Sequence, residues 1–353
     1  MIHLGIELHN VQAILERQGS VTLSRVPEAV RQQLSDLGQA AALNTCGVEL
    51  RFNLDGDEAC VILERQAEAG SQKTQGILEV YHGDFAADYA QSPQIVGIQP
   101  TEIWIRQAPN LERLIELASR FSQRFDPRLV RVILPYDAPI HLLEIRGQVS
   151  PPRTEQSPFR QYLAYGSSIT HGGTAVRPSE SYAMRLANDL GADLTNLGFA
   201  GSAHLEPALA HHIAAQHWEI ATLELGINVI GLWTPERFQQ TVRDFLRVLV
   251  DQCPERPIFC TDLFLCERDL RSDEEIRMFR AIVKAEIERL AHSRLHYCSG
   301  LELLTSAQGL TTDLVHPSAV GMEEIARRWA ALISPVIGTV KRRKPQTSTQ
   351  ETV

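Results

Sequence analysis

Four short segments in the C-terminal half carry residue types that together could perform acyl transfer through a serine nucleophile. The segments are Tyr165–Gly172, Asn196–Gly201, Glu224–Asn228 and Asp313–Pro317. A serine such as Ser168 becomes nucleophilic when a neighbouring base removes its proton, and His316 is such a base. Asp313 lies three residues before His316, so one turn of chain would let its carboxylate hold the imidazole in the productive tautomer.

Three hydrogen-bond donors could stabilise the negative charge that develops on a carbonyl oxygen during such an attack. They are the backbone N–H groups of Ser168 and Gly201 and the side-chain amide of Asn228. One such donor typically lowers the barrier by about 2.7–4 kcal/mol. Each motif alone is common, but their combination in this order favours a serine-dependent catalytic site.

Three more side chains are candidates for the wall of a substrate pocket. His171 and His204 follow the first and second segments closely, and Trp233 follows the third. Each also has a plain structural interpretation, which is a capping or surface position for the histidines and core packing for Trp233.

The sequence gives no sign of a metal, a cofactor or a nucleic-acid partner. His211, His212 and His217 lack the i, i+4 spacing that places two imidazoles on one helical face, and the six cysteines form no C-x-x-C pair. The formal net charge of −9 argues against nonspecific nucleic-acid binding. We expect no cofactor and no metal.

The N-terminal residues and the lengths of the apolar runs indicate the cellular compartment to expect. The first residues show no signal peptide, and we see no apolar run of the ~18–20 residues that a membrane span needs. With cysteines that suggest buried free thiols, the expectation is a cytoplasmic protein. The sequence is compatible with a homo-oligomer and does not decide the oligomeric state.

Alternating strand and helix patterns after residue 159 would position the four segments. The apolar runs are Tyr162–Tyr165, Leu194–Phe199, Ile220–Leu225, Pro257–Phe264 and Leu295–Cys298. The helical stretches are roughly Ser179–Leu190, Glu206–Gln216, Pro235–Gln252, Asp273–Ala291 and Ala319–Ile333. Five such units predict an α/β fold with a parallel sheet covered on both faces. Its ligand site should lie at the carboxyl ends of the strands.

The first 150 residues are mostly strand-like. From Val48 to Leu54 apolar and polar residues alternate, Asp55-Gly56 is typical of a tight turn, and Cys60–Leu63 is a second apolar run, which together predict a hairpin. One helix is predicted from Pro27 to about Leu37. Short strands at close spacing favour a β-sandwich. The predicted organisation is a β-sandwich accessory domain at 1–150, a linker at 151–159, a catalytic domain at 160–338 and a disordered tail at 339–353.

The second half, over about residues 160–333, resembles the SGNH, or GDSL, hydrolase superfamily. The blocks of that superfamily supply Ser, Gly, Asn and His, which correspond here to Ser168, Gly201, Asn228 and His316, and Asp313 corresponds to the accompanying acid. The resemblance implies a flavodoxin-like three-layer α/β/α sandwich with a five-stranded parallel sheet, acting on esters or thioesters without a metal. The wording Y-G-S-S-I-T is similar to a subgroup with an N-terminal β-sandwich, which implies a jelly-roll-like first domain.

Two positions depart from the usual pattern of this superfamily. Ser167 and Val229 stand where an aspartate precedes the nucleophile and follows the third-block asparagine. The local hydrogen-bond network is therefore left open. Ser168 matches the nucleophile by its spacing to Gly172, and Ser167 is the alternative.

We expect a carboxylic-ester hydrolase, of esterase or lipase-like type, that acts through an acyl-Ser168 intermediate. Its substrate would be a small-molecule ester or an acylated carbohydrate or metabolite. One alternative is an acyltransferase that uses the same site with an alcohol, amine or sugar acceptor. An alternative of another class is a non-enzymatic carbohydrate- or partner-binding protein.

Overall fold

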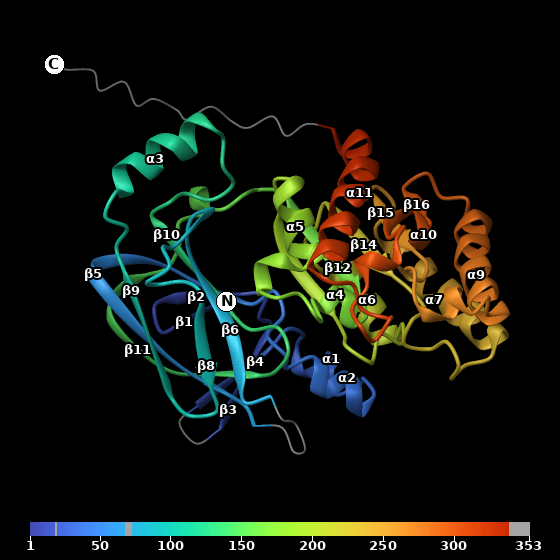
Figure 1. Cartoon of the computed structure of the whole chain (residues 1–353), viewed down its shortest axis with the longest axis horizontal. Helices are drawn as coiled ribbons and strands as arrows, with labels where there is room; N and C mark the ends of the chain where they lie inside the picture. The colour runs from blue at the N-terminus through green and yellow to red at the C-terminus, as the bar shows by residue number, and fades with distance from the viewer. Residues whose placement is uncertain (18–19, 68–72, 339–353) are drawn as a thin grey trace.

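The computed structural model describes residues 1–17, 20–67 and 73–338, and the predicted disordered tail lies outside these residues. A β-rich N-terminal part and an α/β C-terminal part lie side by side (Figure 1). The predicted linker at 151–159 lies between them and contains one short 3₁₀ turn, η1 (Thr154–Gln156). The domain boundaries themselves stay a prediction.

Antiparallel strands build the N-terminal part. They are β1 (Ile2–His3), β2 (Ile6–His9), β3 (Ala13–Arg17), β4 (Ser20–Ser24), β5 (Glu49–Arg65), β6 (Gln75–His82), β7 (Phe85–Ala86), β8 (Gln94–Gly97), β9 (Thr101–Arg106), β10 (Leu129–Ile133) and β11 (Ile140–Ser150). Alternate residues such as Leu50 and Phe52 point into one apolar core. The predicted β-sandwich is confirmed as a β-rich N-terminal domain. The helix α3 (Leu111–Arg120) lies between β9 and β10 in the chain.

The predicted hairpin around Asp55-Gly56 is wrong. Residues Glu49–Arg65 form one continuous strand, whose first part pairs with β2 and β10 and whose second part pairs with β9 and β11. Gly56 does not have the positive φ that a type I′ turn requires. The polar residues at 55–58 mark an exposed stretch of a long strand.

The predicted helix from Pro27 to about Leu37 is two short helices. These are α1 (Glu28–Arg31) and α2 (Asp36–Ala41). Ser35 ends the first segment because its hydroxyl accepts a hydrogen bond from Gly38 N–H and caps the second helix. Both helices project from the β-rich part toward α6 (Pro207–Ala215) of the C-terminal part (Figure 1).

The C-terminal part has the predicted parallel sheet. Its strands are β12 (Gln161–Gly166), β13 (Asp193–Gly198), β14 (Ile220–Glu224), β15 (Ile258–Thr261) and β16 (Leu295–Cys298). Their spatial order is β13-β12-β14-β15-β16, so the first and second strands are exchanged relative to the chain. This is the flavodoxin-like order, and a ligand crevice forms where the strand order reverses.

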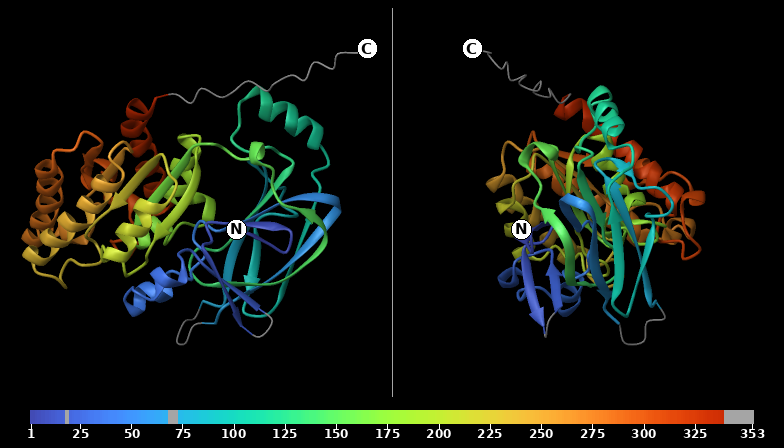
Figure 2. Two further views of the ribbon diagram at one scale, coloured as in Figure 1. Left: turned by 180° about the vertical axis from the view of Figure 1, so that it is seen from behind. Right: turned by 90° about the vertical axis from the view of Figure 1, so that its left-hand side faces the viewer.

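Helices cover both faces of this sheet (Figure 2). One face packs against α5 (Tyr182–Asp189) and α11 (Ala319–Ile337). The other packs against α6, α7 (Pro235–Gln252) and α9 (Glu274–Leu290). The shorter helices are α4 (Ser168–His171), α8 (Glu267–Leu270) and α10 (Gly300–Leu303), with 3₁₀ turns η2 (Pro178–Glu180) and η3 (Ala307–Gly309). The predicted three-layer α/β/α sandwich is confirmed.

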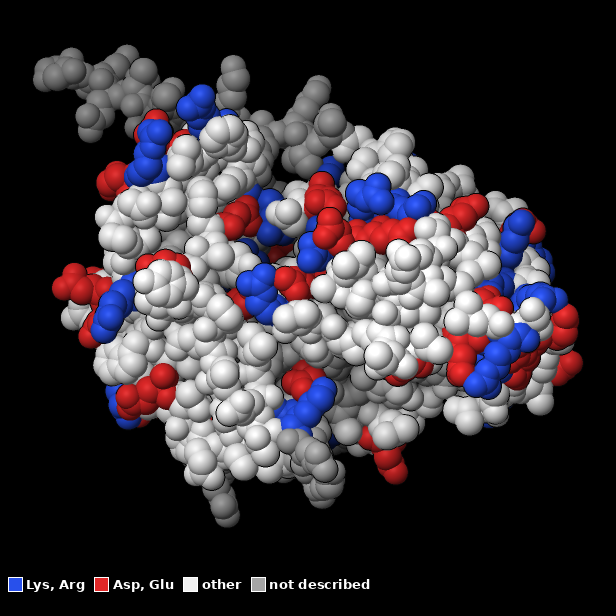
Figure 3. Space-filling model, in the orientation of Figure 1, with Lys and Arg blue, Asp and Glu red and all other residues white. Residues whose placement is uncertain are grey.

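Surface charge and the length and hydropathy of the helices are relevant to binding of nucleic acids and membranes. Acidic and basic side chains are interspersed on the face shown in Figure 3, where no broad basic patch is seen. Among the residues that the structure describes, no helix is both long enough and apolar enough to cross a membrane.

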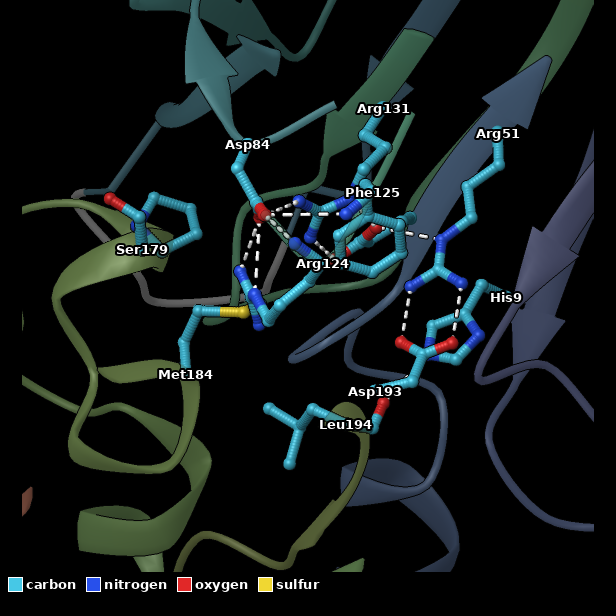
Figure 4. Close-up of polar contacts among 12 residues, drawn as sticks. His9, Arg51, Asp84, Arg124, Phe125, Arg131, Ser179, Met184, Asp193 and Leu194 are labelled. Atoms are coloured by element: carbon cyan, nitrogen blue, oxygen red, sulfur yellow. Dashed lines mark hydrogen bonds and ion pairs between the residues drawn. The ribbon is translucent and has the colours of Figure 1, made fainter. Parts of the chain in front are cut away.

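A buried cluster of charged side chains joins the two parts (Figure 4). Arg51 of β5 donates hydrogen bonds to both oxygens of Asp193, the first residue of β13, at 2.7 and 2.6 Å. Arg51 also donates to Glu49 at 2.8 Å, and Arg131 of β10 donates to the same Glu49 carboxylate at 2.8 and 2.6 Å. These four side chains are buried. Mutual pairing offsets much of the cost of removing the charges from water.

Candidate active site

Ser168 stands at the carboxyl end of β12, which lies between β13 and β14 in the sheet. The strand ends at Gly166, Ser167 is the N-cap residue, and Ser168 is the first residue of α4. A short strand-to-helix turn therefore presents the Ser168 hydroxyl at the edge of the sheet, where it is half-buried.

The structure brings Ser168, His316 and Asp313 together from opposite ends of the C-terminal part. Ser168 Oγ lies 2.7 Å from His316 Nε2. The other ring nitrogen, Nδ1, lies 2.7 Å from Asp313 Oδ2. The arrangement suits proton transfer from the serine to the imidazole, with the carboxylate holding the ring and stabilising its charged form.

A tight turn before α11 fixes Asp313. Its second oxygen, Oδ1, accepts hydrogen bonds from the backbone N–H groups of Val315 and His316, both at 2.9 Å, and from Thr311 Oγ1 at 2.8 Å. Partial burial acts to raise the pKa of Asp313, but these hydrogen bonds outweigh it and hold the pKa well below its ordinary value. The carboxylate stays charged opposite the imidazole.

The three expected oxyanion donors come from adjacent strand ends. Gly201 has a φ of +69°, in the left-handed region that favours glycine, and a Cβ there would meet no atom within 4 Å. Asn228 Oδ1 accepts a hydrogen bond from Ala203 N–H at 3.1 Å. The amide of Asn228 is thereby oriented with its NH₂ group left to donate, and its loop is tied to the loop of Gly201.

Ser167 and Val229 stand at the two positions where the SGNH pattern usually has aspartates. Both are buried. Ser167 Oγ lies 2.7 Å from Glu224 Oε1 and has no hydrogen bond to His316 among the described contacts. This geometry favours Ser168 over Ser167 as the nucleophile. Val229 joins the apolar core that packs against α7.

The pocket candidates separate into two places. His204, three residues after Gly201, and Trp233, five residues after Asn228, line one pocket of about 410 Å³, and their rings lie 5.8 Å apart. The other residues that line the pocket are Ser35, Leu205, Glu206, Pro207, Ala210, Arg237, Thr241, Asp244, Phe245 and Val248. The guanidinium of Arg237 lies 4.0 Å from the centre of the Trp233 ring. Ser35 comes from the N-terminal part, and its N–H donates to Glu206 at 2.7 Å.

His171 lies elsewhere, at the contact between the two parts of the chain. Its side chain is 3% exposed, and its ring nitrogens face the carbonyl oxygens of Tyr136 and Gly198. Burial, together with the charge of nearby Arg25, lowers the pKa of His171 to about 4. His171 thus lies at the contact between the two parts and is not among the residues that line the pocket.

Two residues that support the site were not predicted from the sequence. Thr311 supports the Asp313 carboxylate, and Glu224 supports the turn before Ser168. The sequence feature that could have identified Glu224 is its charge near the end of the apolar run Ile220–Leu225. In the described part of the chain, no group of three or more His, Cys, Asp or Glu side chains could hold a metal ion.

Solved structures share this fold over nearly the whole chain. The salicylyl-acyltransferase SsfX3 from a tetracycline biosynthetic pathway superposes with a TM-score of 0.78 at 20% identity, covering 95% of this chain and 97% of that one. A family two carbohydrate esterase from Cellvibrio japonicus gives 0.61 at 14% identity, covering 95% and 96%. The acetyl xylan esterase Est2A from Butyrivibrio proteoclasticus gives 0.55 at 13% identity, covering 84% and 92%.

Two comparisons were made at the level of sequence. A search among curated proteins found no match. Residues 160–337 match the GDSL-like lipase/acylhydrolase family, and this stretch holds Gly201, Asn228 and the Ser168, Asp313 and His316 side chains. The chain therefore belongs to the GDSL-like lipase/acylhydrolase family.

Proposed function

We propose that this chain is a carboxylic-ester hydrolase that works through an acyl-Ser168 intermediate. The observation that carries the proposal is the continuous chain of contacts from Ser168 Oγ through His316 to Asp313, each 2.7 Å long. Membership in the acylhydrolase family supports it. The non-enzymatic alternative is not proposed, because the side chains that acyl transfer needs are all present.

The proposed reaction has two halves. Ser168 Oγ attacks the ester carbonyl carbon while its proton passes to His316 Nε2, and the N–H groups of Ser168 and Gly201 and the Asn228 amide donate to the oxyanion. The imidazolium then protonates the leaving alcohol as the bond between carbonyl carbon and alkoxy oxygen breaks. Water then attacks the acyl carbon and gives a proton to His316. The imidazolium returns this proton to Ser168 Oγ as the bond between the acyl carbon and Oγ breaks, which releases the acid and free Ser168.

Acyl transfer is the second candidate. It uses the same acyl-Ser168, but an alcohol, amine or sugar hydroxyl takes the place of water. The observation that favours it is the fold likeness to a salicylyl-acyltransferase over 95% of this chain. The two reactions differ only in the group that attacks the acyl-enzyme.

We infer that the pocket lined by His204 receives part of a small-molecule ester or an acylated carbohydrate or metabolite. Its volume of about 410 Å³ lies in the range of small-molecule sites. Apolar walls from Leu205 and Phe245 and polar groups from His204, Glu206 and Arg237 suit a ligand with both characters. The interspersed surface charges and the net charge of −9 disfavour a polyanionic substrate.

Product analysis tests the proposal and separates its two forms. The purified chain is given nitrophenyl esters of increasing acyl length, with and without alcohol, amine or sugar acceptors, and Ser168→Ala is the control. Free acid as the main product supports the hydrolase, and an acylated acceptor in excess over acid supports the transferase. If the wild type releases no more nitrophenol than Ser168→Ala on any ester, the proposed function is wrong.

A further inference from the structure

The carboxylate of Glu224 lies directly behind the turn that carries Ser168. Glu224 is the last residue of β14, which pairs in parallel with β12, and its side chain reaches across to that strand's end. It accepts hydrogen bonds from Ser167 N–H at 2.9 Å and from Ser167 Oγ at 2.7 Å. Thr170 Oγ1, on the other side of Ser168, donates to the same carboxylate at 2.8 Å. The residues on both sides of Ser168 are thus attached to one buried side chain.

Ser167 also connects Glu224 to the first turn of α4. Its hydroxyl has one proton, which goes to Glu224, and a lone pair accepts a hydrogen bond from Ile169 N–H at 3.1 Å. The first turn of α4 is therefore fixed to Glu224 through the N-cap residue and directly through Thr170. Ser168 is the first residue of that turn.

The surroundings of Glu224 are shaped to admit a carboxylate. A Cβ on Gly166 would lie 2.5 Å from Glu224 Oε2, so only glycine at 166 leaves room for it. Glu224 is 2% exposed, and among the described contacts its carboxylate is bound by Ser167 and Thr170 and by no Lys, Arg or His. Burial raises the pKa of Glu224, against the opposing effect of the hydrogen bonds from Ser167 and Thr170. A buried acid without a cation destabilises a fold, which points to a role beyond packing.

We propose that Glu224 is a positioning residue that directs Ser168 Oγ toward His316 Nε2 by holding Ser167 and Thr170. The inference rests on the proposed function, in which Ser168 is the nucleophile. It also accounts for the serine at position 167. A carboxylate there would lie within hydrogen-bonding distance of the Glu224 carboxylate, and the two like charges would repel each other.

The first arm of the test removes the carboxylate. A misplacement of about 1 Å at a reacting group can cost about 100-fold in rate, so E224A is expected to lower kcat about 100-fold with little change in KM. The matched control is D262N. Asp262 is a buried acid that follows the neighbouring strand β15 and bonds to Tyr297 and Gly300, so its loss is expected to affect stability and leave kcat nearly unchanged.

The second arm is a double-mutant cycle that moves the acid to the other side of the contact. S167D alone is expected to lower kcat about 100-fold, because two carboxylates then face each other. In the E224A background the same substitution fills the vacated space, caps α4 again and is expected to raise kcat about 10-fold. This reversal of sign is not expected from a residue that only supports the fold. If E224A does not fold, E224Q takes its place, since its amide can donate to Asp at 167 and S167D/E224Q should exceed S167D.

The outcomes separate this inference from the proposed function. If E224A keeps the wild-type kcat, or if S167D is equally harmful in both backgrounds, Glu224 does not position Ser168. If E224Q has to be used, an S167D/E224Q chain no more active than S167D overturns the inference as well. A wild-type chain that neither cleaves esters nor reacts with a fluorophosphonate refutes the proposed function instead.

Discussion

The ion pair between Arg51 and Asp193 is predicted to hold the two parts of the chain together. Replacing Arg51 by Met keeps most of the side-chain length and removes the charge. Among the described contacts of its side chain, Asp193 then keeps His9, whose Nε2 lies 3.5 Å from Oδ1, while Glu49 keeps both of its bonds from Arg131. The substitution thus leaves one buried carboxylate without its main partner.

The expected cost follows from this geometry. Arg51 is 1% exposed and Asp193 is 5% exposed, so solvent screens the pair little. Breaking a buried pair by removing one partner typically costs about 3–5 kcal/mol, and we expect Arg51→Met to lower the free energy of unfolding by that amount. Replacing both partners by apolar residues, in Arg51→Met with Asp193→Leu, should cost clearly less than the single change, because the buried Asp193 carboxylate is then no longer left without its main partner.

Urea unfolding followed by circular dichroism measures these changes. The matched control is Arg106→Met. Arg106 pairs with Glu58 at 2.9 Å on the surface, with exposures of 67% and 43%, so the free energy of unfolding should change by less than about 0.5 kcal/mol. A loss below about 1 kcal/mol in Arg51→Met, or a double variant as unstable as the sum of its parts, would show that the pair does not stabilise the interface.

Four further predictions concern the site and the pH dependence of stability. Asn228→Ala should lower kcat about 100- to 1,000-fold in steady-state kinetics, because one oxyanion donor is lost. Asp313→Asn should lower kcat about 1,000- to 10,000-fold in the same assay, because the imidazole loses its orienting charge, and a full rate would contradict the assignment. Ser167→Ala should keep a measurable rate, whereas a dead variant would point to Ser167 as the nucleophile. Burial acts to raise the pKa values of Glu49 and Asp193, but their arginine partners hold both below the ordinary range. The folded state then binds fewer protons than the unfolded state, so stability is full at neutral pH and falls below about pH 4. In urea unfolding at pH 7 and about pH 3.5, the wild type should lose more stability than Asp193→Asn.

The arrangement of the candidate site could be predicted because it follows from the sheet. Apolar runs that alternate with helices predict parallel strands, and the carboxyl ends of parallel strands lie at one edge. Residues as distant as Ser168 and His316 were therefore expected to meet. Gly201 and Asn228 follow neighbouring strands for the same reason.

The N-terminal half was harder to predict because tertiary pairing overrides local signals. Asp55-Gly56 looks like a hairpin turn, yet partners on both sides keep β5 extended through it. The alternation of polar Glu49 and Arg51 with apolar neighbours is typical of one solvated face. That face is buried instead, because it packs on Asp193, which is 142 residues away from Arg51.

The role of Glu224 could not be read from sequence for a related reason. A single acid at the end of an apolar run looks like the first polar residue after a strand. Its importance depends on which neighbouring strand end it faces, and this is set by the parallel register of β12 and β14. Only the folded arrangement shows the carboxylate against Ser167.

The most direct test of the central assignment is covalent labelling of Ser168. The purified chain is treated with a fluorophosphonate, digested, and analysed by mass spectrometry, with Ser168→Ala and Ser167→Ala treated in parallel. We predict one phosphonylated site, Ser168, in the wild type and in Ser167→Ala, and no labelling in Ser168→Ala. Labelling on Ser167, or an unreacted wild type, would contradict it.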